Sequence, residues 1–231
     1  MDVLEGRASV LAALRAGRRS FDAVLVRQGI GEDSLRDILD AAAALGVRVQ
    51  RVREEALEAR ARGKSHGGVL ALASPLGPSP VPYPIDFALL LDGVDDGRNL
   101  GYALRTAEAF GVQAVFLRRR AFDFDGGAVS RASSGAFERL PVVLGDGVPE
   151  TLAIVGCVAG AARSIYEEDL ARPLAIAIGG EKRGLSAALR DRCDSLVRIP
   201  TKEDAASLPL THAAAVALSE AARQRVTKQR R

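Results

Sequence analysis

A chain of 231 residues that is 48% hydrophobic and 26% charged has the composition of a folded globular protein, which excludes a disordered tail, a collagen and a small disulfide scaffold. The net charge is only +3, but the pI is about 9.1 and nearly all of the positive charge is arginine. Guanidinium groups suit phosphate, which favours an RNA-binding protein; a genome rich in arginine codons explains the same composition equally well.

The sequence contains no membrane, targeting or metal-binding pattern. Its apolar stretches fall far short of the roughly 20 residues that a membrane-spanning helix needs. Asp2 and Glu5 interrupt the start of the chain, which argues against a secretory signal or transit peptide, so we expect a cytoplasmic protein. Cys157 and Cys193 have no CxxC partner and the chain has only two histidines, so we expect no metal site.

A proline-rich segment divides the chain. Five of the ten prolines lie between Pro75 and Pro84, where fixed φ angles and missing N–H donors exclude a helix or a central strand. We therefore expect a small domain over residues 1–73, a linker over 74–85 and a larger domain over 86–231.

The first 73 residues have the apolar spacing of a small α/β domain. Apolar side chains recur at helical spacing in two segments, 6–16 and 35–45. Short apolar runs predict strands over 23–26, 47–52 and 69–73.

The larger domain alternates apolar runs with helical stretches. The runs that predict strands are 87–91, 114–117, 152–158, 174–178 and 196–199. Strands that are buried on both faces consist of continuous apolar residues, so we predict an α/β fold with an open, mostly parallel sheet and helices on both faces. An alanine-rich helix over about 207–225 is expected to end the domain, with Pro209 in its first turn.

Ligands of open α/β sheets bind beyond the carboxyl ends of strands, so the loops after the apolar runs are candidate sites. The first loop, DGVDDGRNLGYALRTAEAFG over 92–111, places Asn99 as a helix cap and Arg105 near the helix start. The second, IGGEKRGLS over 178–186, has three glycines that let the backbone turn sharply. The third begins at Ile199 and leads through a polar segment into the final helix.

Motifs for several other chemistries are missing. No GxxxxGK[ST] phosphate loop occurs, and Gly29 and Gly31 lack the third glycine of a dinucleotide-binding GxGxxG. In RASSGAFERLP, residues 131–141, a turn at Ser133 and Gly135 offers hydroxyls and backbone donors. Neither histidine lies in a GxSxG-like setting, which argues against a serine hydrolase.

Together and in this order, these segments resemble the three signature motifs of the SpoU/TrmH-like branch of the SPOUT methyltransferases, which methylate the ribose 2′-hydroxyl of RNA. NLGYALRTAEAFG resembles the first motif, IGGEKRGL the second, and IP followed by SL and an alanine-rich helix the third. EGRASVLAAL and KSHGGV in the first domain resemble the substrate-binding domain that many members carry.

The resemblance implies a fold, a cofactor and partners. The fold is an open parallel sheet whose C-terminal chain is threaded as a trefoil knot, an exception to the rule that protein chains are unknotted. The methyl donor is S-adenosyl-L-methionine, and the active form is a homodimer. The added N-terminal domain favours ribosomal RNA over tRNA as the substrate.

The resemblance also implies roles for individual residues. The positions that match catalytic motif residues are Arg105, Asn99 and Glu181. The positions that match donor-binding residues are Gly179, Ile199 and Leu208. The candidates for contact with the RNA substrate are Ser133, Gly135 and Ser207. A guanidinium is a poor base, so Arg105 has a second possible role, which is to stabilise the alkoxide that develops on the ribose.

The sequence departs from the family pattern at Pro209, where members usually have asparagine after SL. Proline lacks both the side-chain amide and the backbone donor. The alternative function is therefore a catalytically inactive RNA-binding module on the same fold. A small-molecule transferase that binds no RNA is a third possibility, and only an RNA-binding protein would show RNA affinity that falls steeply with salt.

Overall fold

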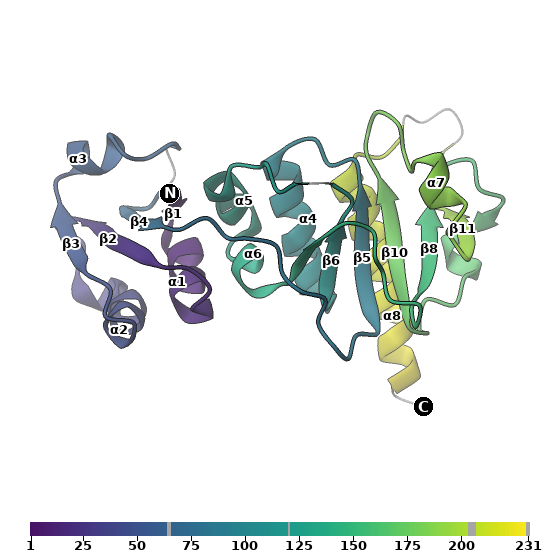
Figure 1. Cartoon of the computed structure of the whole chain (residues 1–231), viewed down its shortest axis with the longest axis horizontal. Helices are drawn as coiled ribbons and strands as arrows, with labels where there is room; N and C mark the ends of the chain where they lie inside the picture. The colour runs from purple at the N-terminus through teal and green to yellow at the C-terminus, as the bar shows by residue number, and fades with distance from the viewer. Residues whose placement is uncertain (64–65, 120, 203–206, 230–231) are drawn as a thin grey trace. The chain divides into compact units, whose positions relative to one another are not determined.

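The computed structural model describes residues 1–63, 66–119, 121–202 and 207–229. Some residues that the sequence motifs and charge runs include lie outside the described residues: Lys64 and Ser65 of KSHGGV, Arg120, Arg230 and Arg231. The chain forms two compact units (Figure 1). The first unit contains residues 1–77 and 123–139, and the second contains residues 78–122 and 140–231.

The first unit is built on a four-stranded mixed sheet with the strand order β1-β4-β2-β3. Its strands are β1 (Asp2–Glu5), β2 (Phe21–Arg27), β3 (Val49–Val52) and β4 (Val69–Ala73). β2 and β3 are parallel, whereas β4 pairs antiparallel with both β1 and β2. The strands expected over 23–26, 47–52 and 69–73 thus correspond to β2, β3 and β4. The short edge strand β1 was not predicted.

Alternate residues of β2 enter two different apolar clusters of the first unit. Val24 and Val26 pack with residues of α1 (Arg7–Ala16) and α2 (Arg36–Ala44). Ala23 and Leu25 pack instead with Leu57 of α3 (Glu54–Glu58). Because successive side chains of a strand point to opposite faces, helices cover both faces of this sheet.

Residues 123–139, which the sequence pattern assigned to the larger domain, belong to the first unit. They form α5 (Gly126–Ser133), which packs on β1, and α6 (Ala136–Arg139), which packs on α1. The approach of α5 to β1 is so close that a Cβ atom on Gly127 would overlap the Val3 carbonyl. The glycines that begin α5 are therefore required by packing.

The second unit contains a seven-stranded sheet in which every neighbouring pair is parallel, as the continuous apolar runs predicted. In spatial order its strands are β7 (Val142–Leu144), β6 (Ala114–Leu117), β5 (Phe87–Asp92), β10 (Leu174–Gly179), β8 (Ala153–Cys157), β11 (Ser195–Arg198) and β9 (Arg163–Ser164). The very short β7 and β9 at the two edges were not predicted. The central strands β5, β10 and β8 lie side by side in Figure 1.

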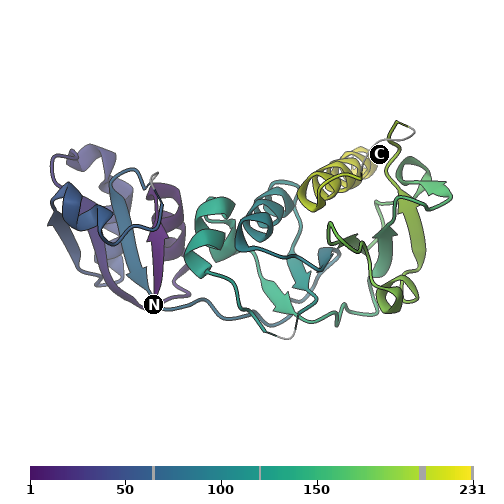
Figure 2. The same ribbon diagram turned by 90° about the horizontal axis from the view of Figure 1, so that it is seen from above.

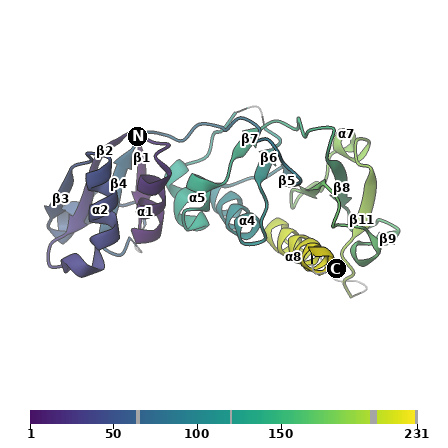
Figure 3. The same cartoon turned by 90° about the horizontal axis from the view of Figure 1, so that it is seen from below.

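Three helices cover this sheet. α4 (Gly97–Ala109) and α8 (Leu210–Gln229) lie side by side, as Figures 2 and 3 show, and α8 also packs on β10. The third, α7 (Ala187–Arg190), contributes Leu189 to an apolar cluster that includes Ala175 and Ala177 of β10. The threading of the C-terminal chain as a knot stays a prediction. No helix within the described part of the chain is long and apolar enough to cross a membrane.

Two helix starts differ from the prediction. The cap of α4 is Asp96, whose carboxylate accepts hydrogen bonds from the backbone N–H groups of Arg98 and Asn99 at 2.8 and 2.9 Å. Asn99 therefore lies inside the first turn and is not the cap. α8 begins at Leu210, after the predicted start at Ser207.

Candidate functional site

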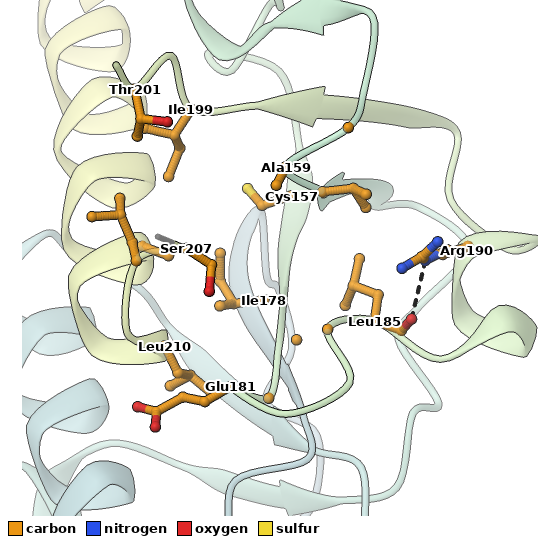
Figure 4. A pocket seen from close by; sticks show the side chains of 17 residues that line it. Cys157, Ala159, Ile178, Glu181, Leu185, Arg190, Ile199, Thr201, Ser207 and Leu210 are labelled. Atoms are coloured by element: carbon orange, nitrogen blue, oxygen red, sulfur yellow. Dashed lines mark hydrogen bonds between the residues drawn. The ribbon is translucent and has the colours of Figure 1, made fainter. Parts of the chain in front are cut away.

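A pocket of about 510 Å³ lies at the carboxyl ends of three parallel strands of the second unit (Figure 4). Its walls are the last residues of β8 and β10, the segments that follow β8, β10 and β11, the last residue of α7 and the start of α8. The size is within the range of small-molecule sites, and the location is the one expected for an open α/β sheet.

Five of the predicted site residues line this pocket. They are Gly179, Glu181, Ile199, Ser207 and Leu208. The first two come from the second sequence motif and the other three from the third motif. Two segments about 20 residues apart in the sequence are thus brought together by the pairing of β10 and β11 with β8.

Arg105 and Asn99 do not line the pocket. Arg105 is exposed on α4, and its side chain makes no hydrogen bond or ion pair within the described part of the chain. Its guanidinium is therefore available to an anionic partner. Asn99 is half-buried in the first turn of the same helix.

Ser133 and Gly135 belong to the first unit and do not line the pocket. The Ser133 hydroxyl is buried, donates to the Ser130 carbonyl at 3.0 Å and accepts from the Phe137 N–H at 3.1 Å. Gly135 has a φ of 88°, and a Cβ atom there would overlap the Ala12 side chain. Both residues have clear packing roles, and their contact with RNA stays a prediction.

The glycine-rich loop after β10 is held by backbone contacts. The Gly180 N–H donates to the Asp92 carbonyl at 2.6 Å, and the Gly184 N–H donates to the Gly180 carbonyl at 2.8 Å. A Cβ atom on Gly179 would overlap the backbone of Gly184 and Leu185. Glycine is thus needed at position 179 so that this loop can fold back closely on itself.

An ion-pair network fastens the same loop to the end of β5. The buried Asp92 carboxylate accepts from the Ser186 N–H at 2.9 Å and from Arg118 Nη1 at 3.3 Å. Arg118 also donates to the Ser186 hydroxyl at 2.8 Å and to the Asp146 carboxylate at 3.0 Å. Hydrogen bonds to Asp146 and then Asp92 raise the pKa of Arg118, and the Arg118 guanidinium lowers the pKa of Asp146.

This network was not predicted from the sequence. Arg118 begins a run of three arginines in the sequence, a local pattern that fits a solvated edge and an RNA contact equally well. The structure instead places it between two carboxylates. The one local signal was Asp92, an acidic residue directly after the apolar run 87–91, where a polar side chain needs a partner if it is buried.

The pocket has mainly apolar walls with a few polar groups at its edges. Large apolar side chains that line it are Ile178, Leu185, Ile199, Leu208 and Leu210. The hydroxyls are those of Thr201 and Ser207, and the charged groups among the lining residues are those of Glu181 and Arg190. Such a site fits a ligand with a flat uncharged part and a charged tail. No three His, Cys, Asp or Glu side chains of the described residues group closely enough to hold a metal ion.

Cys157 lines the pocket, and burial raises the pKa of its thiol to about 12. In a Cys193→Ser variant, alkylation of Cys157 by iodoacetamide is expected to accelerate about tenfold per pH unit from about pH 7 to pH 9, because only the thiolate reacts. Mass spectrometry of the labelled peptide measures the rate. A plateau near pH 9 would contradict this prediction, because it would show a thiol with the ordinary pKa.

Both parts of the chain match known protein families. The model described as the SpoU rRNA Methylase family matches residues 86–219. The model described as RNA 2'-O ribose methyltransferase substrate binding matches residues 3–79.

Individual proteins match over nearly the whole chain. A 23S rRNA (guanosine-2'-O-)-methyltransferase, RlmB, of Bordetella pertussis is 35% identical over an alignment of 239 positions, which covers 96% of this chain and 97% of that protein. A crystal structure of an RNA 2'-O ribose methyltransferase is 30% identical, with a TM-score of 0.79, and the match covers 97% of this chain and 88% of that one. The SpoU methyltransferase AviRb of Streptomyces viridochromogenes, in complex with AdoMet, shares the fold with a TM-score of 0.81 at 24% identity, over 97% of this chain and 90% of that one.

These matches confirm the resemblance that the three motifs indicated. They include the pocket, the glycine-rich loop and the helix that carries Arg105. The chain belongs to the SpoU rRNA methylase family, and it carries the RNA 2′-O-ribose methyltransferase substrate-binding domain at its N-terminus.

Proposed function

We propose that this protein transfers the methyl group of S-adenosylmethionine to the 2′-hydroxyl of a guanosine ribose in 23S ribosomal RNA. The observation that carries the proposal is the pocket, in which the second and third family motifs meet at the carboxyl ends of parallel strands. The guanosine and the 23S RNA follow from the name of a relative that is 35% identical over almost its full length.

The residues of the pocket fit the methyl donor. Leucine and isoleucine side chains provide apolar walls for an adenine ring, and the close-packed glycine loop leaves backbone groups free of side chains at the edge of the pocket. No phosphate-binding loop is needed, because the donor carries no phosphate. We therefore propose Gly179, Ile199 and Leu208 as donor-binding residues.

The reaction requires the ribose oxygen to be aligned with the methyl group and to lose its proton as it attacks. We propose that Arg105 stabilises the negative charge that develops on this oxygen, because its guanidinium is exposed and has no partner within the described residues. Glu181 lies at the edge of the pocket (Figure 4) and is proposed as a second catalytic residue. Asn99 is proposed as a further catalytic residue on the same helix as Arg105.

Pro209 is compatible with this activity. It precedes α8 directly, and its carbonyl accepts the first hydrogen bonds of the helix from the N–H groups of His212 and Ala213, at 3.0 and 2.9 Å. Proline costs little at a helix start, since its missing N–H would lack an intrahelical partner there. The inactive RNA-binding module is therefore not favoured.

We propose a homodimer in the cytoplasm, with the C-terminal chain threaded as a trefoil knot, as the family resemblance implies. Ser207 reaches the pocket edge and is proposed to contact the RNA there. Ser133 and Gly135 also remain proposed RNA contacts, although both are buried in the first unit.

The test is methyl transfer from radiolabelled S-adenosylmethionine to protein-free 23S and 16S ribosomal RNA, followed by nucleoside analysis by mass spectrometry. The expected product is 2′-O-methylguanosine in 23S RNA alone. Replacement of the target nucleotide by its 2′-deoxy form in a short RNA should abolish labelling. A methylated base, or equal labelling of both RNAs, would overturn the proposal.

A further inference from the structure

Two charged side chains line the donor pocket, and they come from different elements. Glu181 belongs to the loop after β10, and Arg190 is the last residue of α7. Figure 4 shows them at separate edges of the pocket, with the apolar side chains of Ile178 and Leu185 between them. The other lining residues within the described part of the chain carry no charge.

The Arg190 guanidinium is held on one side and free on the other. Its Nε donates to the Leu185 carbonyl at 3.0 Å, a bond that Figure 4 marks. Neither Nη atom has an acceptor, and no carboxylate pairs with this side chain, among the described residues. A guanidinium whose Nη edge remains free is arranged to bind a carboxylate through two parallel hydrogen bonds.

We propose that Arg190 binds the carboxylate of the methionine part of the methyl donor. This inference rests on the proposed function, because it assumes that S-adenosylmethionine occupies the pocket. The carboxylate is the one anionic group of that molecule at neutral pH, and Arg190 is the one cationic side chain among the described residues that line the pocket. The adenosine part is uncharged and suits the apolar walls.

The proposal makes Arg190 a residue of binding and specificity. The carboxylate is unchanged when the methyl group leaves, so Arg190 interacts equally with the ground state and the transition state. Such uniform binding lowers KM without raising kcat. The contact between Arg190 and the carboxylate also distinguishes the donor and its product from adenosine derivatives that lack the amino-acid tail.

Isothermal titration calorimetry with two ligands tests this proposal. S-adenosylhomocysteine carries the carboxylate, whereas 5′-methylthioadenosine has the same nucleoside without the amino-acid tail. The Arg190→Gln variant is expected to bind S-adenosylhomocysteine about tenfold more weakly than the wild type and 5′-methylthioadenosine within about twofold of it. In methyl transfer, KM for S-adenosylmethionine should rise about tenfold while kcat stays within about twofold.

Two further variants make the test specific. Arg183→Gln removes the same charge from an exposed residue of the loop after β10. Arg183 itself does not line the pocket, so this variant should leave both affinities unchanged. Arg190→Lys keeps the charge without the planar fork, so it should recover part of the lost affinity for S-adenosylhomocysteine.

Three results would overturn the proposal. Equal weakening of both ligands by Arg190→Gln would show that Arg190 only supports the pocket structure. Unchanged binding of S-adenosylhomocysteine with weaker RNA binding would make Arg190 an RNA contact. If the wild type binds neither ligand in the presence or absence of RNA, the proposed function itself fails, and this inference fails with it.

Discussion

Replacement of Arg105 by alanine is expected to lower kcat for methyl transfer by about 10²- to 10³-fold, the range for loss of one group that stabilises a developing oxyanion. The Kd for S-adenosylhomocysteine should stay within about twofold, because Arg105 does not line the donor pocket. The fold should be unaffected, since the side chain is exposed and alanine favours helices. Single-turnover transfer and calorimetry measure the two quantities separately.

Arg98→Ala is the matched control. Arg98 lies on α4, seven residues before Arg105, which places both side chains on the same face of the helix. If Arg105 acts on the reacting oxygen, the decrease in kcat caused by Arg98→Ala should be at least tenfold smaller than the decrease caused by Arg105→Ala. The prediction is contradicted if Arg98→Ala and Arg105→Ala lose the same activity and both losses disappear at saturating RNA. Arg105 would then only attract RNA through its charge.

The Glu138→Ala variant is expected to lose about 3–5 kcal/mol of unfolding free energy in the first unit, because it leaves the Arg19 charge buried without its main partner. The Glu138 carboxylate accepts from Arg19 Nε at 2.8 Å and from Nη2 at 2.9 Å, and both side chains are 0% exposed. Arg19 also pairs with Asp2 at 2.7 Å. Burial by itself lowers the pKa of Arg19, but Glu138 and Asp2 raise it above the ordinary value.

Hydrogen exchange of α1 and β1 peptides, together with urea unfolding, measures this loss within the first unit. The control is Asp37→Ala, which removes an exposed partner of Arg15 at 3.4 Å and should change the unfolding free energy by less than about 1 kcal/mol. A double variant, Arg19→Met with Glu138→Leu, should recover part of the lost stability, because it removes the unpaired buried charge of Arg19 but leaves Asp2 without its partner. A loss below about 1 kcal/mol in Glu138→Ala would contradict the prediction.

Much of the candidate site followed from local sequence. Continuous apolar runs identified β5 and β10 as strands buried on both faces, and their parallel arrangement follows from the helical stretches between runs. In a parallel sheet the carboxyl ends of strands meet at one edge. Motif order and this geometry together predict that Gly179, Ile199 and Leu208 lie close to one another, and the pocket brings them together.

Other features could not be predicted from local patterns. Asn99 and Asp96 are both good helix caps, and only the backbone geometry decides that Asp96 accepts the N–H groups. Four residues of β1 form too short a pattern to recognise as a strand, and its pairing partner β4 lies more than 60 residues away. No local sequence pattern predicts that Arg190 lies at the pocket.

The family, the parallel α/β architecture and the motif residues could be predicted from the sequence alone, because periodicity, glycine positions and motif order are properties of short segments. The pairing of buried charges, in contrast, depends on contacts between residues that are distant in the chain. Arg19 and Glu138 are 119 residues apart in the chain, and Asp92 and Ser186 are 94 apart. Such pairs form because strands and helices distant in the chain bury the same side chains, and a buried charge is stable only beside its partner.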